Sequence, residues 1–211
     1  DELRPEAPDV IERLRSLGIG RIAMVTGDNE RTATALAGPL ALDEVHAGLL
    51  PEDKVARVEA LRRHGPVAMV GDGINDAPAL AAADVGIAMG AAGSDVAIEA
   101  ADVALMGERL DHLSDAIAHA QRAGRIMRQN LALSALILLT LIPLAAFGVL
   151  GLAAVVATHE LAEVLVIANG VRAGRRQPAR HAAQPGPAAT ARPPAEAAAT
   201  VTVALSQKPS S

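Results

Sequence analysis

The sequence contains no cysteine, no tryptophan and no tyrosine, and its single phenylalanine is Phe147. The absence of cysteine excludes disulfide bonds, iron–sulfur clusters and thiolate-ligated zinc from these 211 residues. With Phe147 as the single residue of the Phe, Trp and Tyr types, stacking platforms for nucleic-acid bases are excluded, and the aromatic belt that many membrane proteins carry is missing. The formal net charge of −5 argues further against nucleic acid as a partner. The composition is instead aliphatic, with 51% hydrophobic residues against 20% charged ones.

The hydrophobic residues are concentrated in two runs near the C-terminal end. The first run, 131–149, carries no charged side chain. The second run, 152–171, has three ionisable side chains, which are His159, Glu160 and Glu163. Each run has about 20 residues, the length that a helix needs to cross a bilayer. We predict a transmembrane helical hairpin over 121–174 rather than two buried core helices, because the first run is apolar all round.

Basic residues flank the predicted hairpin at both ends. Three arginines precede the first run and three follow the second: Arg122, Arg125, Arg128, Arg172, Arg175 and Arg176. The short link around Gly148–Gly151 carries no charge. The positive-inside bias then predicts a multi-pass plasma-membrane protein with both hairpin ends in the cytoplasm. Pro143 is expected to kink the first helix and free a carbonyl group.

The remaining segments flank this hairpin in the sequence. Residues 175–211 are rich in proline, alanine, arginine and glutamine, a composition that predicts a disordered cytoplasmic tail. Residues 1–120 alternate short apolar runs with helix-like segments, which predicts an α/β fold with a parallel sheet. The expected strands are Arg21–Val25, Pro66–Val70, Val85–Met89 and Val103–Met106. The expected helices are Pro8–Leu17, Glu30–Leu36, Pro51–Arg63, Ala77–Ala82 and Ser94–Ala100, with a last helix running from near Leu110 through Arg128 into the bilayer.

Polar motifs stand where sites of parallel sheets form, at the carboxyl ends of strands. Thr-Gly-Asp-Asn at 26–29 follows one expected strand, and Gly-Asp-Gly-Ile-Asn-Asp at 71–76 follows the next. Pro-Glu-Asp-Lys at 51–54 opens the helix between them. Taken singly, these motifs have plainer explanations as a helix cap, a solvated turn and an exposed lysine. Their ordered combination favours a shared site.

The residue types of this site fit phosphoryl transfer. Asp72 and Asp76 on a glycine turn suit Mg²⁺, a hard cation that takes few protein carboxylates. Thr26 offers a hydroxyl group near backbone amides for a phosphoryl oxygen, and Lys54 supplies a compact positive charge. Together they form parts of a phosphoryl-transfer site.

The same motifs carry a resemblance to a known family. TGDN at 26–29, PEDK at 51–54 and GDGINDAPAL at 71–80 resemble the hinge and phosphorylation-domain motifs of P-type ATPases, which belong to the haloacid-dehalogenase-like superfamily. The hairpin and short tail resemble the C-terminal portion of the heavy-metal-translocating branch. The resemblance covers residues 1 to about 174 and implies Mg²⁺ as cofactor and ATP as the substrate of the complete pump.

The resemblance also implies a role for individual residues. By it, Thr26 contacts the phosphoryl group and Lys54 neutralises it. Asp72 binds Mg²⁺ together with Asp76. Asn75 and Asp76 position the phosphate and its water, while Gly27 and Asp28 lie near the nucleotide.

One departure from the family concerns the nucleophile. The family's phosphorylated aspartate lies in an Asp-Lys-Thr-Gly motif, which does not occur here. The chain is therefore expected to be the C-terminal part of a pump and inactive alone, with the missing N-terminal part as its partner on the same or a separate chain. The alternatives are a membrane-anchored phosphatase of the superfamily, for which Asp1 and Asp9 lack the motif, and a non-catalytic fragment that modulates an intact pump.

The ionisable residues of the second apolar run predict a transport site. His159 and Glu163 are four residues apart and share a helix face, and Glu160 lies about 100° around the helix from His159. Imidazole and carboxylate ligands suit divalent Zn, Co, Ni or Fe rather than Cu(I). The His-Glu pair resembles a cobalt-type or broad divalent subgroup, although Leu161 and Ala162 depart from its pattern. A structural pair between helices is the alternative, and a zincin protease is excluded because position 163 is not histidine.

Overall fold

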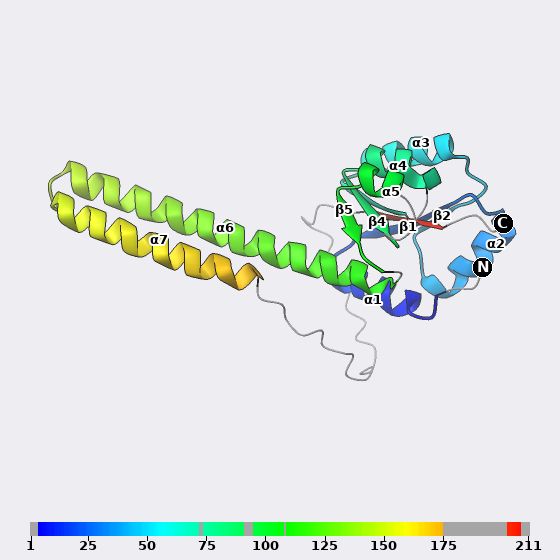
Figure 1. Cartoon of the computed structure of the whole chain (residues 1–211), viewed down its shortest axis with the longest axis horizontal. Coiled ribbons are helices and arrows are strands. Elements are labelled where there is room, and N and C mark those ends of the chain that lie inside the picture. Colours follow the sequence, from blue (N-terminus) through cyan, green and yellow to red (C-terminus); the bar gives the residue numbers. More distant parts are fainter. Residues whose placement is uncertain (1–3, 72–73, 91–94, 108, 175–201, 208–211) are drawn as a thin grey trace. The chain divides into compact units, whose positions relative to one another are not determined.

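The computed structural model describes residues 4–71, 74–90, 95–107, 109–174 and 202–207 (Figure 1). The chain divides into two compact units, one formed by residues 1–114 with 191–211 and the other by residues 115–190. Each unit is described by itself. The domain boundaries expected from the sequence, near residues 120 and 174, remain a prediction.

The first unit is the α/β fold that the alternating pattern predicts. Its strands are β1 (Arg21–Thr26), β2 (Glu44–His46), β3 (Val67–Gly71), β4 (Val85–Met89), β5 (Val103–Leu105) and β6 (Thr202–Gln207). Its helices are α1 (Ala7–Ser16), α2 (Glu30–Ala37), α3 (Pro51–Arg62), α4 (Ala77–Ala82) and α5 (Asp95–Ala100), with short 3-10 turns η1 (Gly38–Leu40) and η2 (Ile74–Asp76). Every predicted strand and helix of this unit is confirmed to within one residue at each end.

The six strands form one sheet in the order β2-β1-β6-β3-β4-β5, and each neighbouring pair is parallel. Two strands were not expected from the sequence. β2 is a three-residue edge strand that pairs with β1. β6 corrects the prediction of a tail disordered throughout residues 175–211, because residues 202–207 lie in the middle of the sheet between β1 and β3. The rest of the predicted tail lies outside the described residues.

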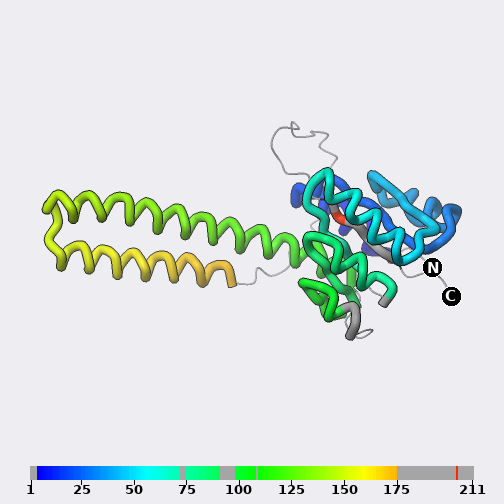
Figure 2. The backbone as a smooth tube through the Cα atoms, turned by 90° about the horizontal axis from the view of Figure 1, so that it is seen from above, coloured from blue at the N-terminus to red at the C-terminus, as the bar shows by residue number. Residues whose placement is uncertain are grey.

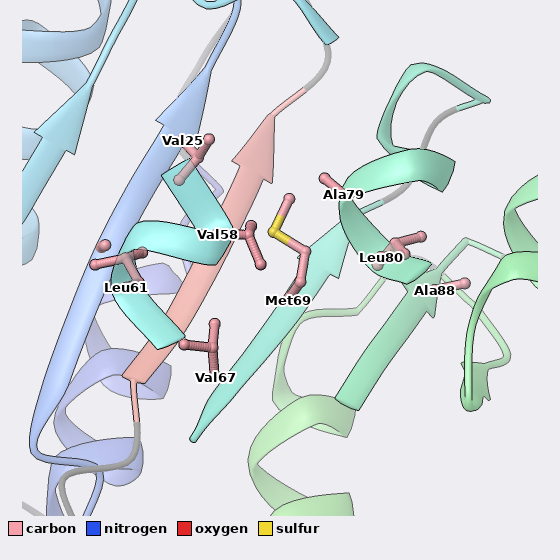
Figure 3. Close-up of a cluster of buried hydrophobic side chains, with 9 residues drawn as sticks. Val25, Val58, Leu61, Val67, Met69, Ala79, Leu80 and Ala88 are labelled. Carbon is pink, nitrogen blue, oxygen red and sulfur yellow. The ribbon is translucent and has the colours of Figure 1, made fainter. Parts of the chain in front are cut away.

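The main hydrophobic core lies between the sheet and the helices α3 and α4 (Figure 3). Val58 and Leu61 of α3 pack there with Met69 of β3 and Leu80 of α4, and all four side chains are at most 2% exposed. In Figure 1, α1 and α2 lie on the other side of the sheet. Coverage of both faces is usual for a parallel sheet, whose strands therefore read as continuous apolar runs.

An aspartate fixes the start of three strand pairs. In each pair, the aspartate at the start of one strand donates its backbone N–H to a carbonyl of the neighbouring strand, and its carboxylate accepts the N–H of that same residue. The three pairs are Asp43 with Ile22, Asp84 with Val67 and Asp102 with Gly86, with carboxylate–nitrogen distances of 2.8, 2.9 and 2.8 Å. We call this arrangement the two-bond aspartate ring. It occurs between β1 and β2, β3 and β4, and β4 and β5, and it fixes their register.

The second unit is a pair of long helices, formed by α6 (Asp111–Ala146) from residue 115 onward and by α7 (Leu152–Gly174). They lie side by side in Figures 1 and 2. α6 continues past Pro143. Both helices are long and apolar enough to cross a membrane, and very little of their apolar segments is buried inside the molecule. Core helices of a soluble protein would be buried, so the exposed apolar surface favours the predicted hairpin over that alternative.

The two-bond aspartate ring formed by Asp84, between β3 and β4, should make the free energy of unfolding depend on pH. The hydrogen bond from Arg62 lowers the pKa of Asp84, and the bond from the Val67 N–H lowers it further. Asp84→Ala should lower the free energy of unfolding by about 1 kcal/mol at neutral pH, since it removes these bonds from a partly exposed group.

A carboxylate whose pKa is lowered on folding stabilises the protein above its ordinary pKa of about 3.9, and this contribution is lost as the pH falls through the folded value. Urea titrations of both chains followed by circular dichroism should therefore show a difference that shrinks below about pH 4. A difference that stays constant down to about pH 2 would contradict this role of the ionised Asp84.

Candidate functional site

Three side chains predicted to act together lie at the carboxyl edge of the sheet. Thr26 is the last residue of β1, Asp76 follows β3 at the start of α4, and Lys54 lies in the first turn of α3. All three are buried, with exposed fractions of 0%, 2% and 3% for Thr26, Asp76 and Lys54. The Lys54 Nζ donates a hydrogen bond to Asp76 Oδ1 at 2.8 Å. The structure therefore brings the lysine of PEDK and the last aspartate of GDGIND into direct contact.

The loop after β1 holds Thr26 in a defined orientation. Its hydroxyl oxygen accepts a hydrogen bond from the Asp28 N–H at 3.1 Å, and its carbonyl oxygen accepts one from the Leu49 N–H at 3.1 Å. The side chain that caps α2 is Asn29, whose Oδ1 accepts the Thr32 N–H at 3.0 Å. Thr26 is thus not the helix cap that the plainer explanation would require. Because its hydroxyl oxygen acts as an acceptor from Asp28, its proton can be donated to an incoming oxygen atom.

The buried Lys54–Asp76 ion pair is by itself weak evidence for a contribution to stability. Replacing a buried pair with packed apolar residues is often neutral or stabilising, whereas removing one partner alone costs about 3–5 kcal/mol. Asp76 is also held closely by the end of β3. A Cβ atom on Gly71 would lie 2.8 Å from Asp76 Cβ and 2.9 Å from Asp76 Oδ2, so only glycine fits here without moving the carboxylate.

The structure describes some, but not all, of the other predicted residues of this site. Asp28 is buried, Gly27 is half-buried and Asn75 is exposed. Asp72 lies outside the described residues, so the predicted pairing of Asp72 with Asp76 at Mg²⁺ stays a prediction. The described part fits that ion, because the Asp76 carboxylate is a hard oxygen donor held at a glycine-bounded strand end.

In the helical pair, the structure brings together two of the three predicted transport ligands. His159 Nε2 lies 3.3 Å from Glu163 Oε1 on α7, as their spacing predicts, and their side chains are 47% and 58% exposed. Within the described part of the chain, no three histidine, cysteine or acidic side chains gather as metal ligands, so Glu160 does not join this pair in a closed site. On α6, the Thr140 hydroxyl group donates a hydrogen bond within its own helix, to the Leu136 carbonyl oxygen at 2.8 Å.

A polar contact between α6 and α7 was not predicted from the sequence. Asn130 donates to Val166 O at 3.2 Å and accepts from Asn169 at 2.7 Å. Arg172 donates to Asn169 Oδ1 at 2.8 Å and extends the contact toward the end of α7. Asparagine next to an apolar run was the available signal, because side-chain amides in membrane helices commonly bond across helices.

The comparisons with known proteins agree with the geometry of both units. The haloacid dehalogenase-like hydrolase family matches residues 1–84. "Probable cation-transporting ATPase G" of Mycobacterium bovis is 62% identical over 178 residues, covering 84% of this chain and 23% of that protein. A "Manganese-exporting P-type ATPase" of M. bovis is 47% identical over 173 residues, covering 82% of this chain and 24% of that protein. A "Zinc-exporting P-type ATPase" of Mycobacterium marinum is 46% identical with the same coverage.

Solved structures give the same relationship. The crystal structure of a zinc-transporting PIB-type ATPase in the E2.Pi state has a TM-score of 0.77 and 45% identity, and the match covers 83% of this chain and 28% of that chain. The chain thus spans about a quarter of the length of the curated relatives it matches. It contains a haloacid dehalogenase-like domain followed by two helices that are long and apolar enough to cross a membrane, and it is homologous to the C-terminal portion of the heavy-metal-translocating P-type ATPases.

Proposed function

We propose that these 211 residues work as the C-terminal part of an ATP-driven exporter of divalent heavy-metal cations. They would supply half of the phosphoryl-transfer site and the last two membrane helices of the pump. The observation that carries this proposal is the buried Lys54–Asp76 pair at the same sheet edge as the buried Thr26. The relatives support the same interpretation, since their printed names describe cation, manganese and zinc transport.

Each residue of the site has a role that its geometry permits. The Thr26 hydroxyl donates to a phosphoryl oxygen, and the Lys54 ammonium group offsets the charge that develops on that oxygen. Asp76 and the exposed Asn75 position the phosphate and its water, while Gly27 and Asp28 lie nearest the nucleotide. Mg²⁺, held by Asp72 and Asp76, would supply further neutralisation of the phosphoryl oxygens.

The group that accepts the phosphoryl is expected from outside these residues. The sequence has no Asp-Lys-Thr-Gly motif, and the phosphatase alternative would need another aspartate. Asp9 is exposed on α1, and Val10 and Ile11 follow it where the family has lysine and threonine. Asp1 lies outside the described residues.

The purified chain alone should therefore form no acyl-phosphate and hydrolyse no ATP. Incubation with radiolabelled ATP and Mg²⁺, followed by acid precipitation, measures this directly. Acid-stable label that is lost at alkaline pH would overturn the proposal and favour the phosphatase alternative. In a complete pump that contains this segment, Asp72→Asn should abolish phosphorylation because it weakens Mg²⁺ binding, and Glu52→Gln in the separate Pro-Glu-Asp-Lys motif serves as the exposed control.

The membrane topology is proposed from the arginines. Six of them flank the two helices, and the link between α6 and α7 has none, so both ends of the hairpin should be cytoplasmic. A phosphatase reporter that is active only outside the cytoplasm, fused after Arg176, should remain inactive. The same reporter inserted at Gly151 should be active. The reverse pattern would refute the hairpin orientation in the plasma membrane.

The cargo is proposed to be a divalent transition-metal ion held in part by α7. His159 and Glu163 already lie within 3.3 Å, and both side chains face away from the bulk of this helical pair, as their exposed fractions indicate. Ionisable groups in a bilayer need partners, so further ligands should come from other membrane helices of the pump. Nitrogen and oxygen donors fit Zn, Co, Ni or Fe(II) and exclude Cu(I) as the preferred ion. The manganese exporter among the relatives adds Mn²⁺ to these candidates.

Substitutions on α7 test the transport site in a reconstituted complete pump. His159→Ala and Glu160→Ala should each lose metal-stimulated turnover and keep phosphorylation from inorganic phosphate, because the cytoplasmic site is intact. Thr158→Ala, which removes only a bond within α7, is the matched control. Unchanged metal activation in both variants would make the His-Glu pair structural.

A further inference from the structure

A chain of side-chain hydrogen bonds joins α6 and α7, which lie side by side in Figures 1 and 2. Arg172 donates to Asn169 Oδ1 at 2.8 Å, and Asn169 Nδ2 donates to Asn130 Oδ1 at 2.7 Å. Asn130 Nδ2 then donates to the Val166 carbonyl oxygen at 3.2 Å. Because an arginine side chain can only donate, it turns the oxygen of Asn169 toward itself and the amide nitrogen toward Asn130. Each amide group therefore has one orientation, and the bonds run from α7 to α6 and back to α7.

The two asparagines lie within the packed contact between the helices. On α7, Ala162 is buried, and Val166 and Asn169 are half-buried. These three residues follow one another at spacings of four and three, as the residues of one helix interface do. We call them the interface stripe of α7. On α6, Asn130 is half-buried, and a Cβ atom on Gly170 of α7 would lie 3.7 Å from its Nδ2 atom. The backbones therefore pass close to each other at the asparagine pair.

The interface stripe also sets the direction of the ionisable side chains of α7. At about 100° per residue, His159 lies about 60° around the helix from Ala162, and Glu163 lies about 100° around in the same sense. Both side chains are therefore on one flank of the stripe, consistent with the 3.3 Å between His159 Nε2 and Glu163 Oε1. Glu160 lies about 160° from Ala162, on the side of α7 opposite the stripe. A slip of α7 by one residue would turn the His159–Glu163 pair by about 100°.

The hydrogen-bond chain can oppose such a slip, whereas aliphatic packing alone specifies it poorly. Most of α6 and α7 beyond the asparagines is aliphatic, and hydrocarbon side chains can interdigitate in more than one register. A hydrogen bond between amides has a direction and a fixed length, and the apolar side chains around it offer no replacement donor or acceptor. A single asparagine in an otherwise apolar helix interface is the best attested device for fixing register.

We infer that Asn130 and Asn169 are positioning residues for the His159–Glu163 pair: their hydrogen bond fixes the register and rotation of α7 against α6, and thereby the flank on which the imidazole and carboxylate are presented to a divalent cation. The register contact concerns α6 and α7 alone. The part that concerns the cation rests on the proposed function. Neither asparagine is assigned as a ligand.

The first experiment measures the register in the full chain in detergent micelles. The sequence has no cysteine, so two introduced cysteines place spin labels at unique positions. Met127→Cys on α6 and Val171→Cys on α7 suit this purpose, because both side chains are exposed. Dipolar electron paramagnetic resonance should give one narrow distance distribution. Asn130→Leu removes the amide at similar size and should broaden this distribution or add a second distance.

A matched control and a second variant accompany this measurement. Gln129→Leu makes the same change at the neighbouring exposed position and should leave the distribution unchanged. Asn169→Leu removes the same bond from the other helix and should reproduce the effect of Asn130→Leu. Circular dichroism should show equal helix content in all of these chains. A distribution that stays narrow and unshifted in both asparagine variants would overturn the register contact.

The second experiment tests positioning in a reconstituted complete pump, activated by Zn²⁺, Co²⁺ or Mn²⁺, each added alone. Asn130→Leu should raise the metal concentration for half-maximal turnover about tenfold, a difference of about 1.4 kcal/mol. Turnover at saturating metal and phosphorylation from inorganic phosphate should stay near the wild-type values, and Gln129→Leu should change none of the three.

A merely structural role predicts a different pattern. Loss of packing would lower saturating turnover and phosphorylation from inorganic phosphate together and leave the half-maximal metal concentration unchanged, and this result would overturn the positioning role. If none of the three ions activates the wild-type pump, or if His159→Ala leaves activation unchanged, the proposed function fails instead. The spin-label distances still decide the register contact in that case, because they involve no cation and no turnover.

Discussion

The buried contact between Lys54 and Asp76 constrains everything around it. Two ionic side chains can be withdrawn from water only if they pair at hydrogen-bond distance, and here the distance is 2.8 Å. To bring them together, α3 must begin at Pro51 beside the end of β3, and the chain must turn directly into α4. Gly71 makes this turn possible, because any larger residue would collide with the Asp76 side chain. The contact therefore fixes where the first turn of α3 and the start of α4 lie relative to each other.

Local sequence patterns were sufficient to predict most of the helices and strands of the α/β unit. β1 and β3 are apolar over their whole length because helices cover both faces of the sheet, and such runs are visible in a single sequence. The helices α3 and α4 begin at residues with recognisable start signals, with proline in the first turn of each. The motif residues Thr26, Lys54 and Asp76 could likewise be placed at strand ends and helix starts from the amino-acid sequence alone. Their contact could not, since no local rule specifies which oxygen atom a lysine reaches.

The two unpredicted strands show the limit of local patterns. β2 has three residues, too few for an alternating or continuous pattern to be distinguished from a loop. β6 has a suitable sequence, Thr-Val-Ala-Leu-Ser-Gln, but it follows a proline- and alanine-rich stretch whose composition dominates any average. Its only partners among the described strands lie far earlier in the chain. Which strands β6 pairs with depends on the tertiary structure, and the six residues alone do not specify it.

The polar side chains of α6 and α7 also interact with residues that are distant in the sequence. Hydrogen bonds between side chains join α6 and α7 at this end of the pair, from Asn169 to Asn130 and from Arg172 to Asn169. Asn130 also donates to the Val166 carbonyl oxygen. A separate polar contact, between His159 and Glu163, leaves both side chains about half exposed on a largely apolar helix. In a bilayer, an ionisable pair on a lipid-facing surface is costly, whereas the same pair against neighbouring helices or a bound cation is stabilised. The exposed pair on α7 therefore fits the proposed role, in which further ligands would come from other membrane helices.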